Sequence, residues 1–139
     1  MTECTFCSIV AGNSSAQRVY EDETTLAVLD TEPATRGHTL VIPKLHRGTI
    51  TEMQESLAGQ VFKTVHRVAS ALEAAYRLDG ISIHQSNGDA AGQDVGHAHV
   101  HVIPRYDDDD VDLEWASQPV EPSTRETVAT TIRSKLASQ

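Results

Sequence analysis

Long apolar segments are absent from this chain of 139 residues. Apolar residues make up 39% of the sequence, and no window approaches the roughly 18 consecutive apolar residues of a membrane-spanning helix. The N-terminus has Glu3 and Cys4 where a signal peptide would need basic residues and an apolar stretch. We therefore expect a single cytoplasmic domain over residues 1–139 that does not associate with membranes.

Basic residues are also scarce, with 11 Lys and Arg against 20 Asp and Glu, which gives a net charge of −9. General binding to nucleic acid needs a basic face, so we do not expect a nucleic-acid partner. The acidic excess has two readings. One is a solvated surface without further function; the other is adaptation to high salt, which the low aromatic content and Asp107–Asp110 favour.

Cysteine occurs only twice, as Cys4 and Cys7. A disulfide between them would close a very short loop and stabilise little. In a cytoplasmic chain the pair indicates either a redox motif or half of a zinc site. A redox pair of this kind follows a strand, and no strand is expected before Cys4. A zinc site would need two further ligands. The cysteine spacing alone does not decide between a redox motif and a zinc site.

The apolar pattern predicts an α+β fold, in which one long helix packs on an antiparallel sheet of about five strands and a C-terminal helix follows. The long helix extends from about residue 54 to 78. A capping box at Thr51 to Gln54 is expected to open it, and Asp79-Gly80 to end it. A second capping box, Ser123 to Glu126, is expected to open a helix to Ala137. The expected strands are 18–22, 25–30, 38–43, 81–86 and 95–104.

The histidines alternate at positions 97, 99 and 101 within the last of these strands. Side chains on a strand alternate between its faces, so His97, His99 and His101 are expected on one face. A surface strand without function is one reading of this pattern. The other readings are a metal site and a site that acts on a polyanion, because neutral imidazole serves both purposes.

The loop before the histidines, residues 87–96, is rich in glycine and offers amide groups from Asn87 and Gln93. Such a loop can bring backbone N–H groups close to an anion. Next to imidazoles, it suits a phosphate that undergoes displacement. An imidazole nitrogen can attack the phosphorus, expel a leaving group and form a phosphoramidate that water later hydrolyses.

The His-x-His-x-His pattern at residues 97–103 resembles the histidine triad (HIT) superfamily, in particular its prokaryotic Hint-like branch. The further matches are Phe6–Ile9, Tyr20–Glu23, Leu29–Asp30, Gly37–Lys44, Ala91–Gln93 and Ile103–Tyr106. The resemblance covers residues 4–106. The tail, residues 107–139, with its acidic segment and helix, is not matched.

The resemblance implies a catalytic role for three histidines. His99 corresponds to the nucleophile that takes the nucleotidyl group at the α-phosphate, and His101 to a residue that binds and orients the phosphate. His38 corresponds to a histidine that holds the imidazole of the nucleophile. The implied substrate-binding residues are Phe6, Ile9 and Thr31 around the base, Asp30 at the ribose, and Asn87 and Gln93 at the phosphate and leaving group.

The resemblance also implies a structural zinc site. Some bacterial members hold zinc with residues that correspond to Cys4, Cys7, His46 and His97, a closed set of four ligands. His99 and His101 then remain free for catalysis. His66 is expected to be a solvated helix residue, and His84 has no assigned role.

Two differences from the family bear on the substrate. Eukaryotic Hint proteins have Ser where this chain has Asp94, and the loop from Asn87 is one residue shorter. The Asp94 carboxylate is expected either to weaken the binding of anionic leaving groups or to assist a cationic amine. Because of this difference in loop length, Gln93 matches its family position more closely than Asn87 does.

The family implies a homodimer that acts as a hydrolase of purine nucleotides, similar to nucleoside phosphoramidases, through a nucleotidyl-His99 intermediate. The alternatives are a dinucleoside polyphosphate hydrolase, a metallohydrolase in which all three triad histidines bind zinc, and a catalytically weak nucleotide-binding sensor.

Overall fold

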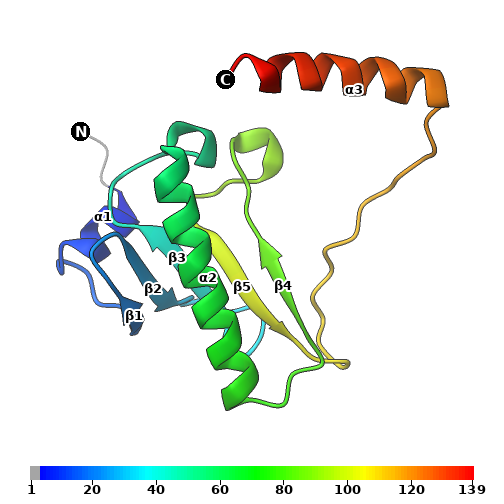
Figure 1. Ribbon diagram of the computed structural model, residues 1–139. Helices are drawn as coiled ribbons and strands as arrows, with labels where there is room; N and C mark the ends of the chain where they lie inside the picture. Colours follow the sequence, from blue (N-terminus) through cyan, green and yellow to red (C-terminus); the bar gives the residue numbers. More distant parts are fainter. Residues whose placement is uncertain (1–3) are drawn as a thin grey trace.

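Five antiparallel strands form one open sheet in the order β1-β2-β3-β5-β4 (Figure 1). This computed structural model describes residues 4–139, so Glu3, on which the expected lack of a signal peptide partly depends, lies outside the described residues. The strands are β1 (Arg18–Glu21), β2 (Thr25–Leu29), β3 (Thr39–Pro43), β4 (Gly80–His84) and β5 (Val100–Arg105). The predicted α+β class with an antiparallel five-stranded sheet is confirmed.

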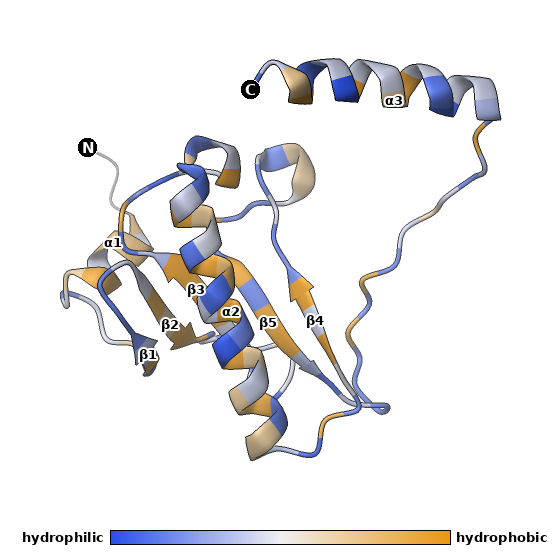
Figure 2. Cartoon of the chain, in the orientation of Figure 1, coloured by the Kyte–Doolittle hydropathy of each residue, from blue (hydrophilic) through white to orange (hydrophobic). Residues whose placement is uncertain are grey.

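The long helix α2 (Glu55–Ala75) crosses one face of this sheet. Its buried residues recur every three or four positions, as helical periodicity requires. They are Val61, Thr64, Val65, Val68 and Leu72. They pack on Ala27, Val41, Val100 and Val102 from the central strands. In Figure 2 these central strands are the most apolar part of the chain.

The short helix α1 (Thr5–Val10) covers part of the opposite face. Its Phe6 and Ile9 pack on side chains of β2 and β3 that point away from α2. These are Leu26, Val28, Leu40 and Ile42. Both faces of the central strands are therefore buried, which explains why β2 and β3 are almost continuously apolar. We call the sheet face under α1 the α1 face.

Both predicted capping boxes are wrong. Thr51 lies inside a short 3-10 helix, η1 (Ile50–Glu52), so it is not available to cap α2, which begins after Gln54 without a side-chain cap. The second helix, α3 (Pro122–Ala137), begins one residue before Ser123 because proline fits the first helical position, where its missing N–H costs nothing. Gly80 does not end α2, which stops at Ala75; it opens β4 instead.

The predicted histidine strand is also too long at its start. β5 begins at Val100, so His97 and His99 precede it. The backbone N–H of Ala98 donates to the carbonyl of Arg47 at 2.7 Å, outside the pairing of β3 with β5. The three side chains nevertheless share one face, as predicted: the ring of Phe6 makes edge contacts with the rings of His97 and His99, and the ring of His101 lies 5.0 Å from that of His99.

The C-terminal segment extends away from the sheet and ends in α3 (Figure 1). Asp109 anchors its start, because its carboxylate accepts from Arg105 Nε and the backbone N–H of Tyr106, both at 2.8 Å. At least one residue of the acidic run Asp107–Asp110 is therefore structural. Among residues 4–139, no helix combines the length and apolar character needed to cross a membrane.

Candidate functional site

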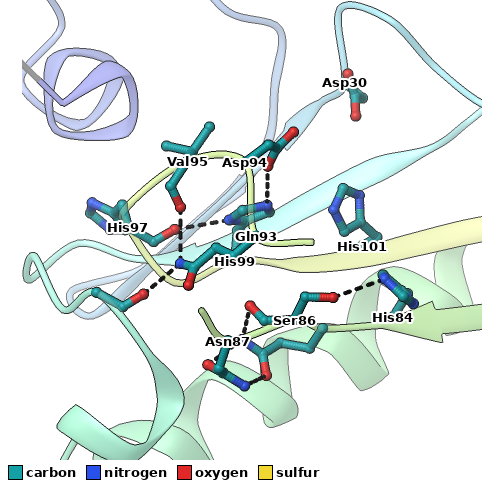
Figure 3. A network of polar contacts seen from close by, with 12 residues as sticks. Asp30, His84, Ser86, Asn87, Gln93, Asp94, Val95, His97, His99 and His101 are labelled. Carbon is teal, nitrogen blue, oxygen red and sulfur yellow. Dashed lines mark hydrogen bonds and ion pairs between the residues drawn. The ribbon is translucent and has the colours of Figure 1, made fainter. Parts of the chain in front are cut away.

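Histidines from three places in the chain gather on the α1 face. His101 pairs with Leu40 of β3 and with His84 of β4 in the sheet register. Directly opposed residues of antiparallel strands share a face, and Leu40 belongs to the core under α1. His84, His99 and His101 lie close together on that face (Figure 3). The ring centroids of His38 and His99 lie 5.1 and 5.0 Å from the ring centroid of His101.

His38 and His101 form a directed hydrogen-bond chain. The backbone N–H of Ala34 donates to His38 Nδ1 at 2.9 Å, so that nitrogen carries no proton. His38 Nε2–H then donates to His101 Nδ1 at 2.9 Å. His101 must carry its own proton on Nε2, where it can donate to a ligand. His38 thus contacts His101, whereas the family resemblance implied a contact with His99.

Burial keeps both rings of this pair neutral near pH 7. It lowers the pKa of His38, an effect that the nearby carboxylate of Asp30 opposes. It also lowers the pKa of His101 to about 4, with further contributions from the neighbouring His99, His38 and His84. Neutral rings agree with the hydrogen-bond chain, in which each imidazole needs one nitrogen without a proton.

The orientation of His99 is set by the backbone carbonyl of His97. His99 Nδ1–H donates to that carbonyl at 2.8 Å, which leaves Nε2 as the nitrogen with the free lone pair. The side chain is buried, and its ring makes an edge contact with Phe6 at 5.1 Å. Asp94 Oδ1 lies 3.4 Å from Nε2. The imidazole of His99 is thus oriented by the backbone, and a carboxylate lies beside its Nε2.

Gln93 fastens the loop that precedes the histidines. Its Oε1 accepts from the backbone N–H of Gly88 at 2.7 Å, and its Nε2 donates to the carbonyls of Gly48 and Val95 at 2.6 and 2.9 Å. Both amide hydrogens are therefore engaged with the protein. Gln93 lies beside the histidines, as expected, but its present contacts stabilise the loop (Figure 3).

Asn87 joins the start of the same loop to η1. Its Oδ1 accepts from the backbone N–H of Ile50 at 2.7 Å, and its side chain exchanges two hydrogen bonds with Gln85. Gln85 was not among the residues predicted for the site. Only its position two residues before Asn87, at the end of a strand, could have indicated a partner.

The residues expected around the nucleoside lie close to the histidines to different degrees. Phe6 contacts the ring of His99, and the Asp30 carboxylate lies 3.5 Å from His38 Nε2. Ile9 is buried in the core under α1. Thr31 is exposed next to Asp30. On the α1 face, Phe6 therefore lies next to His99, and Asp30 lies next to His38.

A second cluster of ligand-type side chains contains Cys4, Cys7, His46 and His97. Their donor atoms all lie within 4.8 Å of one another. His46 Nδ1 and His97 Nδ1 are 3.2 Å apart, and each cysteine Sγ lies 3.2–3.3 Å from one of these nitrogens. Tetrahedral coordination with bonds of about 2.0–2.3 Å places donor atoms about 3.3–3.7 Å apart. The cluster therefore fits a tetrahedral metal ion.

The surroundings of the cluster favour metal binding further. His97 Nε2–H donates to the carbonyl of Pro43 at 2.8 Å, which leaves Nδ1 free for a ligand bond. Burial and the neighbouring Cys4 raise the pKa of the Cys7 thiol, so a cation between the two sulfurs would offset the cost of deprotonation. Within residues 4–139, no cluster gathers donor atoms of His97, His99 and His101, the set that the catalytic-metal reading requires.

Three proteins of known sequence are informative relatives. Protein hit of Bacillus subtilis is 39% identical over 138 residues, which cover 97% of this chain and 95% of that protein. Adenosine 5'-monophosphoramidase hnt1 of Schizosaccharomyces pombe is 31% identical and covers 96% and 98% of the two chains. Adenylylsulfatase HINT3 of Arabidopsis thaliana is 39% identical over 84% of this chain and 57% of its own length.

Solved structures share the fold. A HIT family protein from Bacillus anthracis is 38% identical, with a TM-score of 0.91 over 95% of this chain and 96% of its own. A zinc-bound histidine triad family protein from Mycobacterium smegmatis is 35% identical, with a TM-score of 0.74 over 98% and 97% of the two chains. The HIT domain family matches residues 11–108. With the triad, the sheet and these relatives in agreement, the chain belongs to the HIT family of proteins.

Proposed function

We propose that this protein hydrolyses purine nucleotides at the α-phosphate through a covalent nucleotidyl-His99 intermediate, in the manner of a nucleoside phosphoramidase. The observation that carries the proposal is the orientation of His99. Its Nδ1–H is held by the carbonyl of His97, so Nε2 carries the free lone pair, and this nitrogen lies beside the exposed Asp94. Relatives that are named as an adenylylsulfatase and a monophosphoramidase support nucleotide chemistry in general.

The first step is attack of His99 Nε2 on the α-phosphorus. A bond from nitrogen to phosphorus forms while the bond from phosphorus to the leaving group breaks, and the leaving group departs with the electron pair and takes up a proton. His101 Nε2–H donates to a phosphate oxygen and stabilises the developing negative charge. His38 holds His101 in the tautomer that permits this donation.

The second step is hydrolysis of the intermediate. A water molecule attacks the phosphorus from the side that the leaving group vacated and gives a proton to solvent, while the bond to His99 Nε2 breaks and its electron pair returns to that nitrogen. The nucleoside monophosphate leaves and His99 is restored. Asp30 and Phe6 are placed to contact the ribose and the purine, since they border the histidines on the α1 face.

Cys4, Cys7, His46 and His97 are proposed to hold a structural zinc ion. Four protein ligands leave no open position, so the ion would stabilise the site without acting on the substrate. It would tie α1 to the segment that contains His97. Because the carbonyl of His97 orients His99, a metal ion bound to His97 would also fix the orientation of the nucleophile.

A homodimer is proposed because β4 is an edge strand that pairs on one side with β5. An exposed edge offers unpaired backbone groups to a second copy, and Ile83 on this strand is 51% exposed. Sedimentation equilibrium should show a dimer, and Ile83→Lys should shift it toward the monomer. The control Leu45→Lys changes an equally exposed apolar residue away from β4 and should remain dimeric.

The nucleophile is tested by trapping the intermediate. Wild-type protein mixed briefly with adenosine 5'-phosphoramidate and quenched should gain the mass of one adenylyl group, on His99. His99→Ala should show neither the adduct nor turnover, while its circular dichroism spectrum stays unchanged. His66→Ala, at an exposed position on α2, is the matched control and should behave as wild type. Full turnover by His99→Ala would refute the proposal.

A further inference from the structure

We propose that a cavity between α2 and the sheet binds a small carboxylate with an apolar chain, of the kind found in a medium-chain fatty acid. The cavity has a volume of about 320 Å³ and lies between the C-terminal half of α2 and residues of β1, β2 and β3. Val68 and Leu72, which line it, belong to the core under α2. The cavity is therefore on the sheet face opposite to the catalytic histidines, and the inference is independent of the proposed function.

Small side chains on α2 leave this space open. Arg67, Ala71 and Ala75 are spaced by four residues, so they lie along one side of the helix, and all three line the cavity. The methyl groups of the two alanines are too short to fill the gap to the sheet. On the strand side, Val19 and Leu29 are 52% and 38% exposed. An apolar ligand would remove these side chains from water, which favours its binding.

The volume and the lining of the cavity define the size and character of the ligand. Sites for small organic ligands occupy about 300–1,000 Å³, so this cavity is at the lower end of the range. It suits one apolar chain of about eight carbons better than a nucleotide or a folded segment of another protein. Most of the lining side chains are apolar: Val19, Leu29, Val68, Ala71, Leu72 and Ala75.

The polar groups of the cavity leave one free cation for a ligand. The hydroxyl of Tyr20 donates to Asp22 at 2.9 Å, and the hydroxyl of Thr39 donates to the carbonyl of Gly37 at 2.8 Å. Both are thus engaged with the protein. The guanidinium of Arg67 lies at the cavity, with its Cζ 5.9 Å from the centre of the Tyr20 ring. Its N–H groups have no acceptor among residues 4–139, and a guanidinium offers only donors.

Charge favours a carboxylate as the partner of this guanidinium. A second arginine, Arg36, lies with its Cζ 4.8 Å from the centre of the ring of Tyr76, which also lines the cavity. In the part of the chain that the structure describes, neither arginine has a carboxylate partner, because the ion pairs of arginine and lysine are those of Arg18, Lys44 and Arg105. Two such arginines create a local positive potential on a chain with 20 acidic and 11 basic residues. A guanidinium binds a carboxylate through paired hydrogen bonds.

The test is isothermal titration calorimetry with probes that share one chain and differ in the head group. Octanoate should bind the wild-type protein at one site per chain, about tenfold more tightly than 1-octanol, because only the carboxylate accepts charge-assisted hydrogen bonds from Arg67. Octylamine, whose head group is cationic, should bind most weakly. Hexanoate should bind about tenfold more weakly than octanoate, because two fewer CH₂ groups are buried.

Three variants locate the site. Arg67→Gln removes the charge and should lower the affinity for octanoate to about that for 1-octanol. Arg77→Gln is the matched control: Arg77 is exposed, follows α2 and does not line the cavity, so octanoate should bind this variant as it binds wild type. Ala71→Leu places a longer side chain in the cavity and should weaken octanoate binding by more than about tenfold, with an unchanged circular dichroism spectrum.

Several results would overturn the inference. Octanoate that binds wild type no more tightly than 1-octanol does would contradict recognition of the carboxylate, as would an unchanged affinity in Arg67→Gln. Unchanged octanoate binding by Ala71→Leu would place the ligand elsewhere. If Ala71→Leu instead alters the oligomeric state in sedimentation equilibrium, the cavity is an interface between copies of the chain and the inference fails. None of these measurements depends on nucleotide turnover, so they leave the proposed function untouched.

Discussion

Burial of His101 makes the stability of the fold depend on pH in a defined window. The folded state holds the pKa of His101 at about 4, below the value of about 6.5 for an unfolded histidine. Between these two values the unfolded chain binds more protons than the folded one, so the free energy of unfolding falls as the pH falls. The resulting loss in the free energy of unfolding is small at pH 7 and reaches its full size below pH 4.

The magnitude follows from the two pKa values. The linkage relation gives a loss of about 2 kcal/mol between pH 7 and pH 5 for a complete shift. The ring is partly accessible, which reduces the expected loss to about 1–2 kcal/mol. His101→Gln retains a side chain that can accept from His38 Nε2–H but does not titrate. It should therefore lose less stability than wild type over this interval.

The assay is urea denaturation at pH 7 and pH 5, for wild type, His101→Gln and the exposed control His66→Gln. Loss of metal or protonation of other groups affects all three proteins and cancels in the comparison. The control should lose as much stability as wild type. If His101→Gln loses as much as both, then His101 titrates normally in the folded state and the reasoning about its burial fails.

Further perturbations test other parts of the molecule. Cys4→Ser should lose bound zinc, measured by mass spectrometry of metal content, and melt at a lower temperature, whereas His99→Ala should retain the metal. Gln93→Ala should lower phosphoramidate turnover about a hundredfold by releasing the loop, with a small change in melting temperature. Asp22→Ala should lower the free energy of unfolding by about 1–3 kcal/mol, because Asp22 accepts from two backbone N–H groups of the β1–β2 turn. Adaptation to high salt predicts unfolding free energies that rise up to molar salt, and denaturation curves that do not respond to salt would refute it.

Local periodicity was sufficient to predict much of the fold. The spacing of Val61, Val65, Val68 and Leu72 predicted α2, and these residues are buried against the sheet. The ends of the elements could not be predicted as well. The capping-box pattern at Thr51 is a local signal, but Thr51 lies in the short helix η1 instead. The backbone N–H of Ile50 in η1 donates to Asn87 Oδ1, 37 residues away in sequence, and a local pattern cannot predict such a contact.

The candidate site shows the same division. The resemblance in sequence placed Cys4, Cys7, His46 and His97 in one cluster, and the structure brings their donor atoms together. No sequence pattern indicated that His38 would contact His101, or that Gln93 would use both amide hydrogens to fasten a loop. Both findings depend on which backbone groups approach these side chains in space.

By itself, the sequence determined which chemical groups are available: the alternating imidazoles, the thiol pair and a carboxylate at position 94. These are set by residue type and short spacing. The family resemblance also implied that the three triad histidines differ, but only the tertiary structure shows the contacts by which they do. β5 begins at Val100, and before it the backbone N–H of Ala98 donates to the carbonyl of Arg47. His97 then turns to the cysteines, while its carbonyl orients His99. These contacts join residues that are far apart in the sequence, and residue alternation along a strand carries no information about them.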